Sequence, residues 1–269
     1  MSSSMKAKTE NRPPARLPPG TTLDDFLGGR IKIAQPKQGH RAGSDAVWLQ
    51  AAVGARAGDK VLDAGAGVGV AGLCLLARCP QIHVTAVDID EGAVALAEAN
   101  AQLNAHAAHF RAITLDLTAH SETLIAKGLV REGYDQAMAN PPFHVEGTVR
   151  PAPDAGRAAA HIMEAGALES WVRFLATFTA SKGRITLIHM PQALPQLLPL
   201  LDRRFGAVTL FPLFPKAAEP AVRVIVQARK GSRAGMRLLP GLVLHEADGR
   251  YTAKAEAVLR HGQALELGD

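Results

Sequence analysis

Cysteine is nearly absent from this chain, because the 269 residues contain only Cys74 and Cys79. No cluster of cysteine and histidine at metal-ligand spacing surrounds them, so the sequence predicts two reduced thiols and no bound metal. No apolar run approaches the roughly 18 residues that a membrane-spanning helix requires. The first residues also lack the apolar segment of a secretion signal. These absences exclude a disulfide scaffold, predict no contact with a membrane, and predict a cytoplasmic location.

Apolar residues are plentiful, whereas charge is unevenly distributed. Apolar side chains make up 47% of the sequence, which is enough for a sizeable core and excludes global disorder. The net charge is +5 with a pI near 9.4, and lysine and arginine are concentrated in residues 1–20 and 202–260. This excess is either a footprint for nucleic-acid phosphates or an ordinary solvated surface. The candidate phosphate contacts are Arg229, Lys230, Arg233 and Arg237.

Composition divides the chain into three parts. Residues 1–20 are rich in Ser, Pro, Lys and Arg without periodicity, so they predict a disordered basic tail. Residues 21–230 carry alternating strand and helix patterns and are expected to form the main α/β domain. Residues 231–269 are expected to be a basic C-terminal extension packed on the same domain, with a short strand at 242–245 and a helix at 253–260.

The most informative stretch is VLDAGAGVG at residues 61–69. A short apolar strand ends here, three glycines follow at alternate positions, and an apolar helix begins after them. Glycine is required because the backbone turns sharply and a Cβ would obstruct an approaching ligand. The stretch therefore predicts the first strand–turn–helix unit of a nucleotide-binding sheet. The residues expected at the ligand are Asp63, Ala64, Gly65, Ala66 and Gly67.

Two cofactors are compatible with these glycines. Residues 67–72 match the dinucleotide fingerprint G-x-G-x-x-G, which would indicate an NAD-linked oxidoreductase. However, Asp63 stands just before the turn, where a carboxylate would repel a pyrophosphate but attract a cation such as an α-ammonium group. The order Asp-x-Gly-x-Gly-x-Gly resembles the motif of class I methyltransferases that use S-adenosyl-L-methionine (AdoMet). We therefore prefer AdoMet as the cofactor.

Acidic residues follow the next two predicted strands. Asp88, with Ile89 beside it, has the spacing of a carboxylate that binds both ribose hydroxyls of the cofactor. An alternative role for Asp88 is to cap the helix that begins near Glu91, and the two roles can coexist. Asp116, followed by Leu117, is placed to accept a hydrogen bond from the exocyclic amine of the cofactor's adenine.

A polar loop precedes the first helix of the main domain. Ser44 is expected to be the N-cap of this helix, and Asp45 lies in its first turn, where the helix dipole favours an acid. Two interpretations fit Arg41 in the loop. It leans over the methionyl end of the cofactor, or it and Asp45 brace the helix against the sheet.

The second motif, Asn140-Pro141-Pro142-Phe143, ends the predicted strand 134–139. The prolines fix φ and remove two N–H donors, which leaves rigid backbone carbonyl groups. The Asn140 amide and the Pro141 carbonyl can both accept hydrogen bonds from one –NH2 group, and Phe143 offers a stacking face. A plain strand-end turn is the alternative. The motif's place at the carboxyl end of a parallel strand, beside the cofactor, favours a catalytic site.

With these motifs in this order, the chain resembles the bacterial tRNA1(Val) adenine-N6 methyltransferase family over about residues 22–262. The segments QGHRAGSDA (38–46), RPAPDAGRA (150–158) and GRYT (249–252) are also similar to that family. The resemblance implies tRNA as the partner, residues 140–143 around the target adenine, and AdoMet held by Asp63, Gly65, Asp88 and Asp116. Many members have Tyr where this chain has Phe143, and Asn-Pro-Pro-Phe-His is also similar to rRNA guanine-N2 enzymes.

The expected fold is the Rossmann-like class I methyltransferase fold: a seven-stranded, mostly parallel sheet with helices on both faces and one late antiparallel strand. The expected reaction is direct methyl transfer to an exocyclic amine, with the base flipped out of any stack. Three alternatives stay open: a guanine amine as acceptor, a protein glutamine as acceptor, and an RNA-binding module with a non-catalytic AdoMet pocket. The sequence predicts no particular oligomeric state.

Two later segments complete the prediction. Residues 145–166 form a connection longer than most, which either closes over the site or is a disordered crossing. The following helix carries Trp171, Phe174 and Leu175 on one apolar face, and these three side chains are expected to belong to the core.

Overall fold

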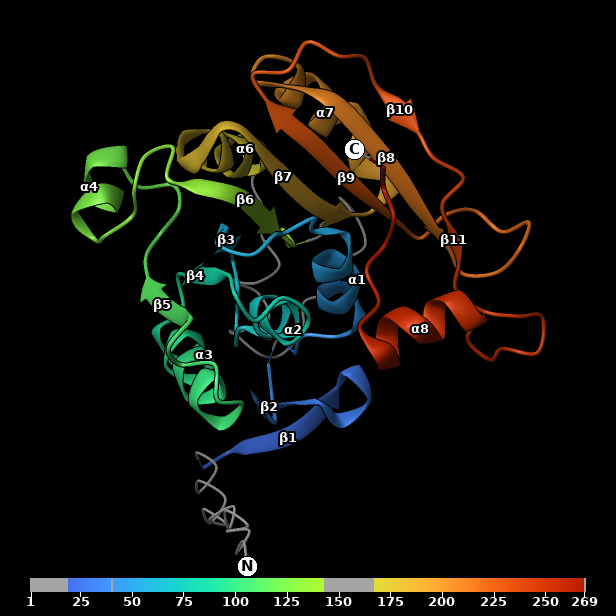
Figure 1. Cartoon of the computed structure of the whole chain (residues 1–269), viewed down its shortest axis with the longest axis horizontal. Coiled ribbons are helices and arrows are strands. Elements are labelled where there is room, and N and C mark those ends of the chain that lie inside the picture. The colour runs from blue at the N-terminus through green and yellow to red at the C-terminus, as the bar shows by residue number, and fades with distance from the viewer. Residues whose placement is uncertain (1–18, 40, 143–166, 269) are drawn as a thin grey trace, which may run out of the picture.

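One large sheet organises the computed structural model, which describes residues 19–39, 41–142 and 167–268 (Figure 1). Within these residues the sheet has nine strands in the order β10-β8-β9-β7-β6-β3-β4-β5, with β11 also paired to β8. Strands β3 to β7 run parallel to their neighbours among themselves, and β9 is antiparallel to both β7 and β8. The strands are β3 (Lys60–Ala64), β4 (His83–Asp88), β5 (Phe110–Thr114), β6 (Tyr134–Ala139), β7 (Thr179–His189), β8 (Phe205–Phe214), β9 (Arg223–Lys230), β10 (Arg237–Leu238) and β11 (Leu242–Val243).

The predicted fold class is confirmed, with one difference in strand number. The seven longer strands, β3 to β9, are the seven expected, and β9 is the late antiparallel strand. The other two, β10 and β11, contain two residues each and extend the edge beside β8. Strands this short carry too little alternation to be recognised in the sequence, although β11 lies within the segment expected to be a strand.

Helices cover both faces of the sheet and divide the core into two apolar clusters. The first cluster holds buried side chains of α1, α2, α3 and α8, and the second holds those of α4, α6 and α7. The central strands contribute to both clusters because successive side chains point to opposite faces; Val61 lies in the first and Leu62 in the second. The helices are α1 (Ser44–Ala52), α2 (Val70–Arg78), α3 (Glu91–Leu103), α4 (Ser121–Ala126), α6 (Ala167–Phe178), α7 (Leu194–Asp202) and α8 (Ala253–His261), with short 3-10 turns at Leu27–Gly29 and Pro191–Ala193.

An antiparallel hairpin, β1 (Thr21–Phe26) and β2 (Ile31–Pro36), precedes the sheet. The side chain of Asn100 on α3 fastens this hairpin: its Oδ1 accepts the N–H of Ala34 at 2.7 Å, and its Nδ2 donates to the Ala34 carbonyl at 3.1 Å. The same Nδ2 donates to the carbonyl of Val68, in the glycine-rich loop, at 3.0 Å. Asn100 is completely buried, so one amide joins the hairpin, α3 and the loop.

The C-terminal residues pack along the first cluster. Ala255 and Val258 of α8 are buried beside residues of α1, and the N–H of Leu265 donates to the carbonyl of Ala51 at 2.7 Å. The guanidinium of Arg237 donates to the carbonyl of Leu267 at 3.2 Å. Residues 231–268 therefore share a core with the sheet instead of forming a core of their own.

The described residues include both cysteines and the start of α1, about which the sequence made predictions. Cys74 and Cys79 are free thiols, and burial raises the pKa of Cys74 to about 12, which makes it unreactive. The N-cap prediction for Ser44 is wrong, because Gly43 occupies the cap position in extended backbone and Ser44 is already helical. No helix among the described residues is long and apolar enough to cross a membrane. The predicted long connection 145–166, and residues 1–18 of the predicted tail, lie outside the described residues.

Candidate active site

The turn between β3 and α2 is built from glycines with left-handed backbone. Gly65, Gly67 and Gly69 have φ of 64°, 54° and 86°, values that other residues adopt only with strain. The N–H groups of the turn are already used: Ala66 donates to the Val87 carbonyl at 3.0 Å, and Gly69 to the Ala66 carbonyl at 3.0 Å. Gly67 donates to Oδ2 of Asp88 at 2.7 Å. These three donors are unavailable to a pyrophosphate, which favours AdoMet over a dinucleotide.

Asp63 lies beneath this turn with only 2% of its surface exposed. Burial raises the pKa of its carboxyl group to about 7; the hydrogen bond from the Gly72 N–H, at 3.1 Å, lowers the pKa, and the nearby Asp88 raises it further. A carboxylate with so little compensation is stabilised by a cation. The α-ammonium group expected for AdoMet is such a cation, so Asp63 fits the predicted role.

Asp88 ends β4 and faces the same turn. Its Oδ2 accepts the Gly67 N–H, and its Oδ1 accepts the N–H of Asp90 at 3.0 Å. The helix-capping alternative is wrong for Asp88, because the N-cap of α3 is Asp90, whose side chain accepts the N–H groups of the first turn. Each Asp88 oxygen retains capacity for another donor. Ile89, next in the chain, is 69% exposed.

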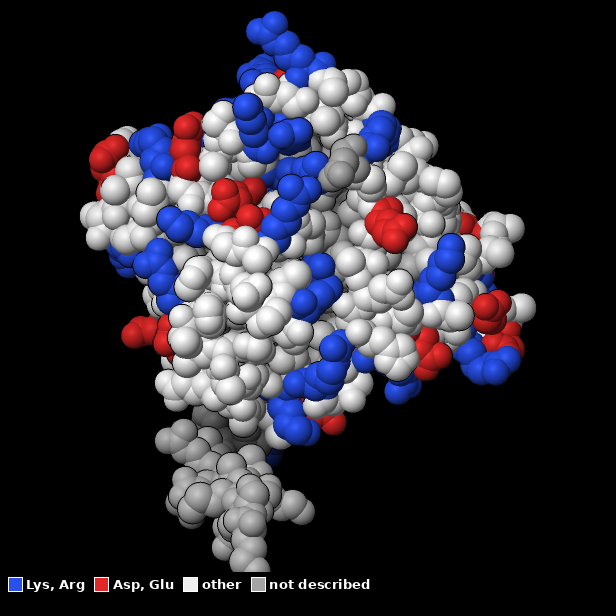
Figure 2. Space-filling view, viewed as in Figure 1, with Lys and Arg blue, Asp and Glu red and all other residues white. Residues whose placement is uncertain are grey.

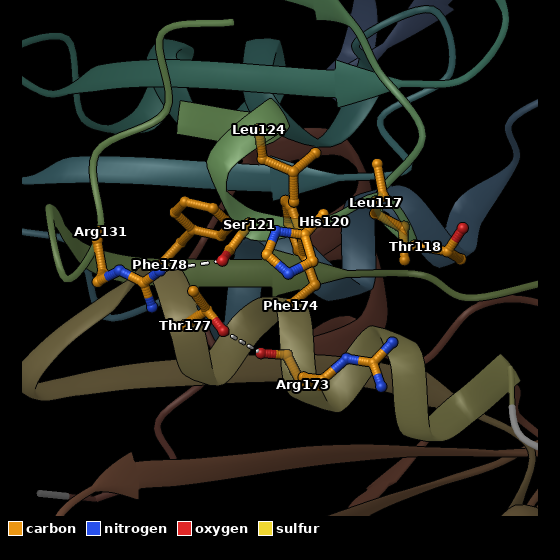
Figure 3. A pocket seen from close by; sticks show the side chains of 11 residues that line it. Leu117, Thr118, His120, Ser121, Leu124, Arg131, Arg173, Phe174, Thr177 and Phe178 are labelled. Atoms are coloured by element: carbon orange, nitrogen blue, oxygen red, sulfur yellow. Dashed lines mark hydrogen bonds between the residues drawn. The ribbon is translucent and has the colours of Figure 1, made fainter. Parts of the chain in front are cut away.

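Asp116 follows β5 and closes its own loop. Its Oδ1 accepts the backbone N–H of Thr118 at 2.8 Å and the Thr118 hydroxyl at 2.7 Å, and neither bond involves Oδ2. Leu117 borders a hollow of about 440 Å³ between α4 and α6 (Figure 3). In Figure 3 the Arg131 side chain reaches toward Ser121, to which it donates a hydrogen bond at 3.0 Å. Of the predicted site residues that the structure describes, Leu117 alone lines this hollow.

Asn140 and the first proline of the second motif stand at the carboxyl end of β6. Ala139 of β6 pairs in register with Ala64 of β3, so Asn140 and Gly65 follow directly from neighbouring positions. Pro141 is buried and Pro142 is half-buried. The Oδ1 atom of Asn140 is inaccessible to solvent and has no hydrogen-bond partner in the described part of the chain. Buried polar atoms in proteins nearly always have a partner, so this oxygen requires an explanation. Phe143 lies outside the described residues.

Arg41 contacts the hairpin. Its guanidinium donates to the Thr22 hydroxyl at 2.8 Å and to the Pro36 carbonyl at 2.6 Å, and it also pairs with Asp24. Asp45 in α1 forms a salt bridge of 2.9 Å with Arg223, at the start of β9. The Asp45 salt bridge joins α1 to the sheet, as the bracing interpretation states, whereas the Arg41 bonds link the two strands of the hairpin. The role of Arg41 toward the cofactor stays a prediction.

Trp171 packs against the second cluster, as expected, but it is less buried than its apolar neighbours on α6. Phe174 and Leu175 are buried in the second cluster as expected, at 2% and 0% exposure, but Trp171 is only partly buried. Its ring lies against Gly65, where an added Cβ would come within 2.3 Å of the ring atom Cη2. The periodicity of α6 gives no signal for this contact, because all three side chains share one apolar face.

The sheet order, the closed glycine turn and the buried Asp63 together define a class I methyltransferase. Residues 43–166 match the family described as the methyltransferase small domain. The chain is thus an AdoMet-dependent N-methyltransferase.

Comparisons with individual proteins narrow the class to one family. A tRNA1(Val) (adenine(37)-N6)-methyltransferase of Porphyromonas gingivalis is 31% identical over 242 residues, which cover 85% of this chain and 91% of the relative. The crystal structure of a predicted O-methyltransferase from Agrobacterium tumefaciens is 26% identical, covers 82% of this chain and 97% of that one, and has a TM-score of 0.69. A release factor glutamine methyltransferase of Bordetella pertussis is 38% identical over 96 residues, or 36% of this chain and 31% of the relative. The chain belongs to the tRNA1(Val) adenine-N6-methyltransferase family.

Proposed function

We propose that this enzyme transfers the methyl group of AdoMet to N6 of an adenine in tRNA. The observation that carries the proposal is the buried Oδ1 of Asn140 at the carboxyl end of β6, which has no hydrogen-bond partner among the residues that the structure describes. An acceptor without a donor is what an amine substrate would complete on entering the site. The adjacent Pro141 carbonyl is the second acceptor that a planar –NH2 group requires.

These two oxygens orient the acceptor amine. When Asn140 Oδ1 and the Pro141 carbonyl accept its two N–H hydrogens, the nitrogen becomes more pyramidal. Its lone pair is then less conjugated with the ring and more available to attack the methyl group. AdoMet supplies the activated methyl group, so the protein contributes mainly position and orientation. After transfer, the surplus proton leaves the nitrogen for solvent, so a strongly basic side chain is unnecessary. Phe143 is proposed to stack on the flipped base.

The acidic residues proposed to hold AdoMet occur in the sequence in the same order as the groups of AdoMet that they would bind. Asp63 would pair with the α-ammonium group, Asp88 would accept from the ribose hydroxyls, and Asp116 would accept from the adenine amine. Ile89 and Leu117 would provide apolar contacts to the adenine. The residues from Ala64 to Gly67 would pass close to the ligand, since glycines at two of these positions leave room for it.

Adenine in tRNA is preferred over the other acceptors because of how far each likeness extends. The tRNA-modifying relative aligns over 91% of its own length and 85% of this chain. The protein-glutamine relative aligns over a segment alone. Asn-Pro-Pro with a following aromatic residue suits any exocyclic or amide nitrogen, so the motif by itself does not select among adenine, guanine and glutamine.

Identifying the labelled product tests the proposal. The protein would be incubated with AdoMet carrying a labelled methyl group and with total tRNA, rRNA or protein in separate reactions. We expect label in tRNA, recovered as N6-methyladenosine after digestion to nucleosides. Label recovered chiefly in rRNA guanine or in a protein glutamine would refute the assignment of the acceptor.

Asn140→Ala is the matched variant for this experiment. Because Asn140 acts on the acceptor, we expect kcat to fall by about 100-fold or more while AdoMet affinity stays within a few-fold of wild type. Calorimetry with AdoMet supplies the control for folding and cofactor binding. A variant with the wild-type kcat would remove Asn140 from the mechanism.

The hydrogen bonds of the basic residues separate those that hold the fold together from those that are candidates for contacting RNA. Figure 2 shows Lys and Arg side chains gathered near the end of β9 and α7. Of the four candidate phosphate contacts, Lys230 donates to three protein oxygens, Arg237 to Thr209 and the Leu267 carbonyl, and Arg229 to the Lys182 carbonyl. Lys230 and Arg237 thus hold the fold together. Arg229 and Arg233 remain the better candidates for phosphate contacts.

A further inference from the structure

Trp171 differs from the other large apolar side chains of its helix. The chain has two tryptophans, and Trp48 is buried at 2% exposure in α1, whereas Trp171 is partly exposed beside the glycine turn. The neighbours of Trp171 on α6, Val172, Phe174 and Leu175, are almost completely buried. They fix the helix, so the position of the indole over the turn is set by the core.

The contact between Trp171 and Gly65 is close. A Cβ added to Gly65 would lie 2.3 Å from Cη2 and 3.0 Å from Cζ3 of the indole, so the outer edge of the six-membered ring points at Gly65. Gly65 is thus constrained twice, by its positive φ and by the ring above it. An aromatic side chain and a glycine are therefore in contact at the first residue of the turn.

The order of residues indicates which part of AdoMet meets this ring. Asp63, proposed for the ammonium group, lies two residues before Gly65, and Asp88, proposed for the ribose, is bonded to the N–H of Gly67. In AdoMet the sulfonium lies between the amino-acid part and the ribose. If these residues bind AdoMet as proposed, the sulfonium would be held near the Gly65 end of the turn, beside Trp171; this step rests on the proposed cofactor residues.

We propose that Trp171 is a specificity residue that favours the cationic cofactor AdoMet over its neutral product, S-adenosyl-L-homocysteine. The face of an indole attracts cations more strongly than any other side-chain ring. The two ligands share the ammonium, ribose and adenine groups, so Asp63, Asp88 and Asp116 bind both alike. Loss of the methyl group removes the charge that Trp171 recognises, which assists release of the product.

The ratio of two dissociation constants tests this proposal. Calorimetry would give the Kd of S-adenosyl-L-homocysteine divided by that of AdoMet for wild type, Trp171→Phe and Trp171→Leu. We expect the ratio to fall about threefold to tenfold in Trp171→Leu and by less in Trp171→Phe, whose ring attracts cations more weakly. Leu175→Ala is the control: it disturbs the packing of the same helix without touching Gly65, and the ratio should not change.

Fluorescence gives a second readout that does not depend on Trp171→Leu folding. Because Trp48 is buried away from solvent, AdoMet should change the emission of wild type through Trp171, and the change should disappear in Trp171→Phe. An emission change that persists in Trp171→Phe, or an unchanged ratio in Trp171→Leu, would overturn the inference and leave the proposed function standing. Failure of wild type to bind AdoMet at all would overturn both.

Discussion

Ionisation of one buried carboxyl group should make cofactor binding depend on pH. The pKa of Asp63 is raised to about 7, mainly by burial. The ammonium group of AdoMet favours the ionised form, so binding below pH 7 requires Asp63 to lose a proton. We expect AdoMet affinity to increase as pH rises from 5 to 7, by up to about tenfold per pH unit. Calorimetry in buffers of different ionisation enthalpy would detect the released proton.

The same shift has the opposite effect on the free protein. Since the folded pKa lies above the unfolded value of 3.8, the folded state binds the proton more tightly, and stability from this group declines as pH rises from about 4 to about 7. Asp63→Asn provides the control for both effects. Its AdoMet affinity should be weaker and nearly independent of pH in this range. An unaltered pH profile in the variant would assign the dependence to another group.

At the level of single residues, spacing in the sequence predicted where a side chain lies in the fold better than it predicted which groups that side chain bonds to. Asp63 and Asp88 were recognisable because each stands in the last residues of a strand, at a characteristic distance from the glycines. Capping of α3 was an alternative role for Asp88, yet Asp90 takes that role, because two acids in one short loop offer the same chemistry. Trp171 was unrecognisable as a neighbour of the turn, since its contact with Gly65 depends on how α6 packs against β6 and β7.

Strand β9 is joined to helix α6 by one lysine. The Lys230 ammonium donates to the carbonyls of Ala176 and Thr179 at 2.6 and 2.7 Å and to Glu132 at 2.8 Å, and its side chain is 18% exposed. Lys230→Met would leave two carbonyl groups without their donor. We expect the free energy of unfolding to fall by about 1–3 kcal/mol in denaturant titrations.

Lys254→Met is a suitable comparison, because Lys254 is an exposed lysine on α8. Its effect should stay within about 0.5 kcal/mol. AdoMet affinity should be unchanged in Lys230→Met. The C-terminal end of the antiparallel strand β9 lies beside the N-terminal ends of β7 and β6, whereas Asn140 follows the C-terminal end of β6. Equal stability of the two variants would show that the Lys230 bonds contribute little.

Whole elements were predicted where the pattern was strong. The units from β3 to β6 were recognisable because buried parallel strands alternate with helices and end in acids or Asn-Pro. The two-residue strands β10 and β11 depend on pairing with β8, which no local pattern specifies. Gly43 took the cap position in place of Ser44, since glycine is tolerated there and the chain enters the helix in extended form.

At the scale of the molecule, we propose that the described residues between 21 and 268 fold as one cooperative unit, despite the change in composition after Lys230. Buried residues of α8 belong to the same cluster as α1, and Leu265 bonds to Ala51. Calorimetry of the intact chain should therefore give one unfolding transition. A separate transition that is lost on removal of residues 231–269 would instead identify the extension as an independent domain.

The charge excess can be tested without disturbing the fold. Arg229→Gln combined with Arg233→Gln leaves Lys230 and Arg237 in place. If both arginines contact phosphates, the log–log dependence of tRNA affinity on salt should become less steep by about two units, roughly one for each lost contact. AdoMet affinity is the internal control and should not change. Identical salt slopes for variant and wild type would mean that this surface is merely solvated.

The buried amide of Asn100 makes the amino-terminal hairpin part of the cofactor loop's support, although the two are far apart in the chain. Opening the hairpin would break both hydrogen bonds between Ala34 and the Asn100 amide, and would leave the bond from Asn100 Nδ2 to the Val68 carbonyl. Local opening events in proteins control how fast backbone hydrogens exchange with solvent. A ligand that steadies the glycine turn should therefore slow hydrogen exchange at Ala34, so the hairpin would report occupancy of a site that it does not itself touch.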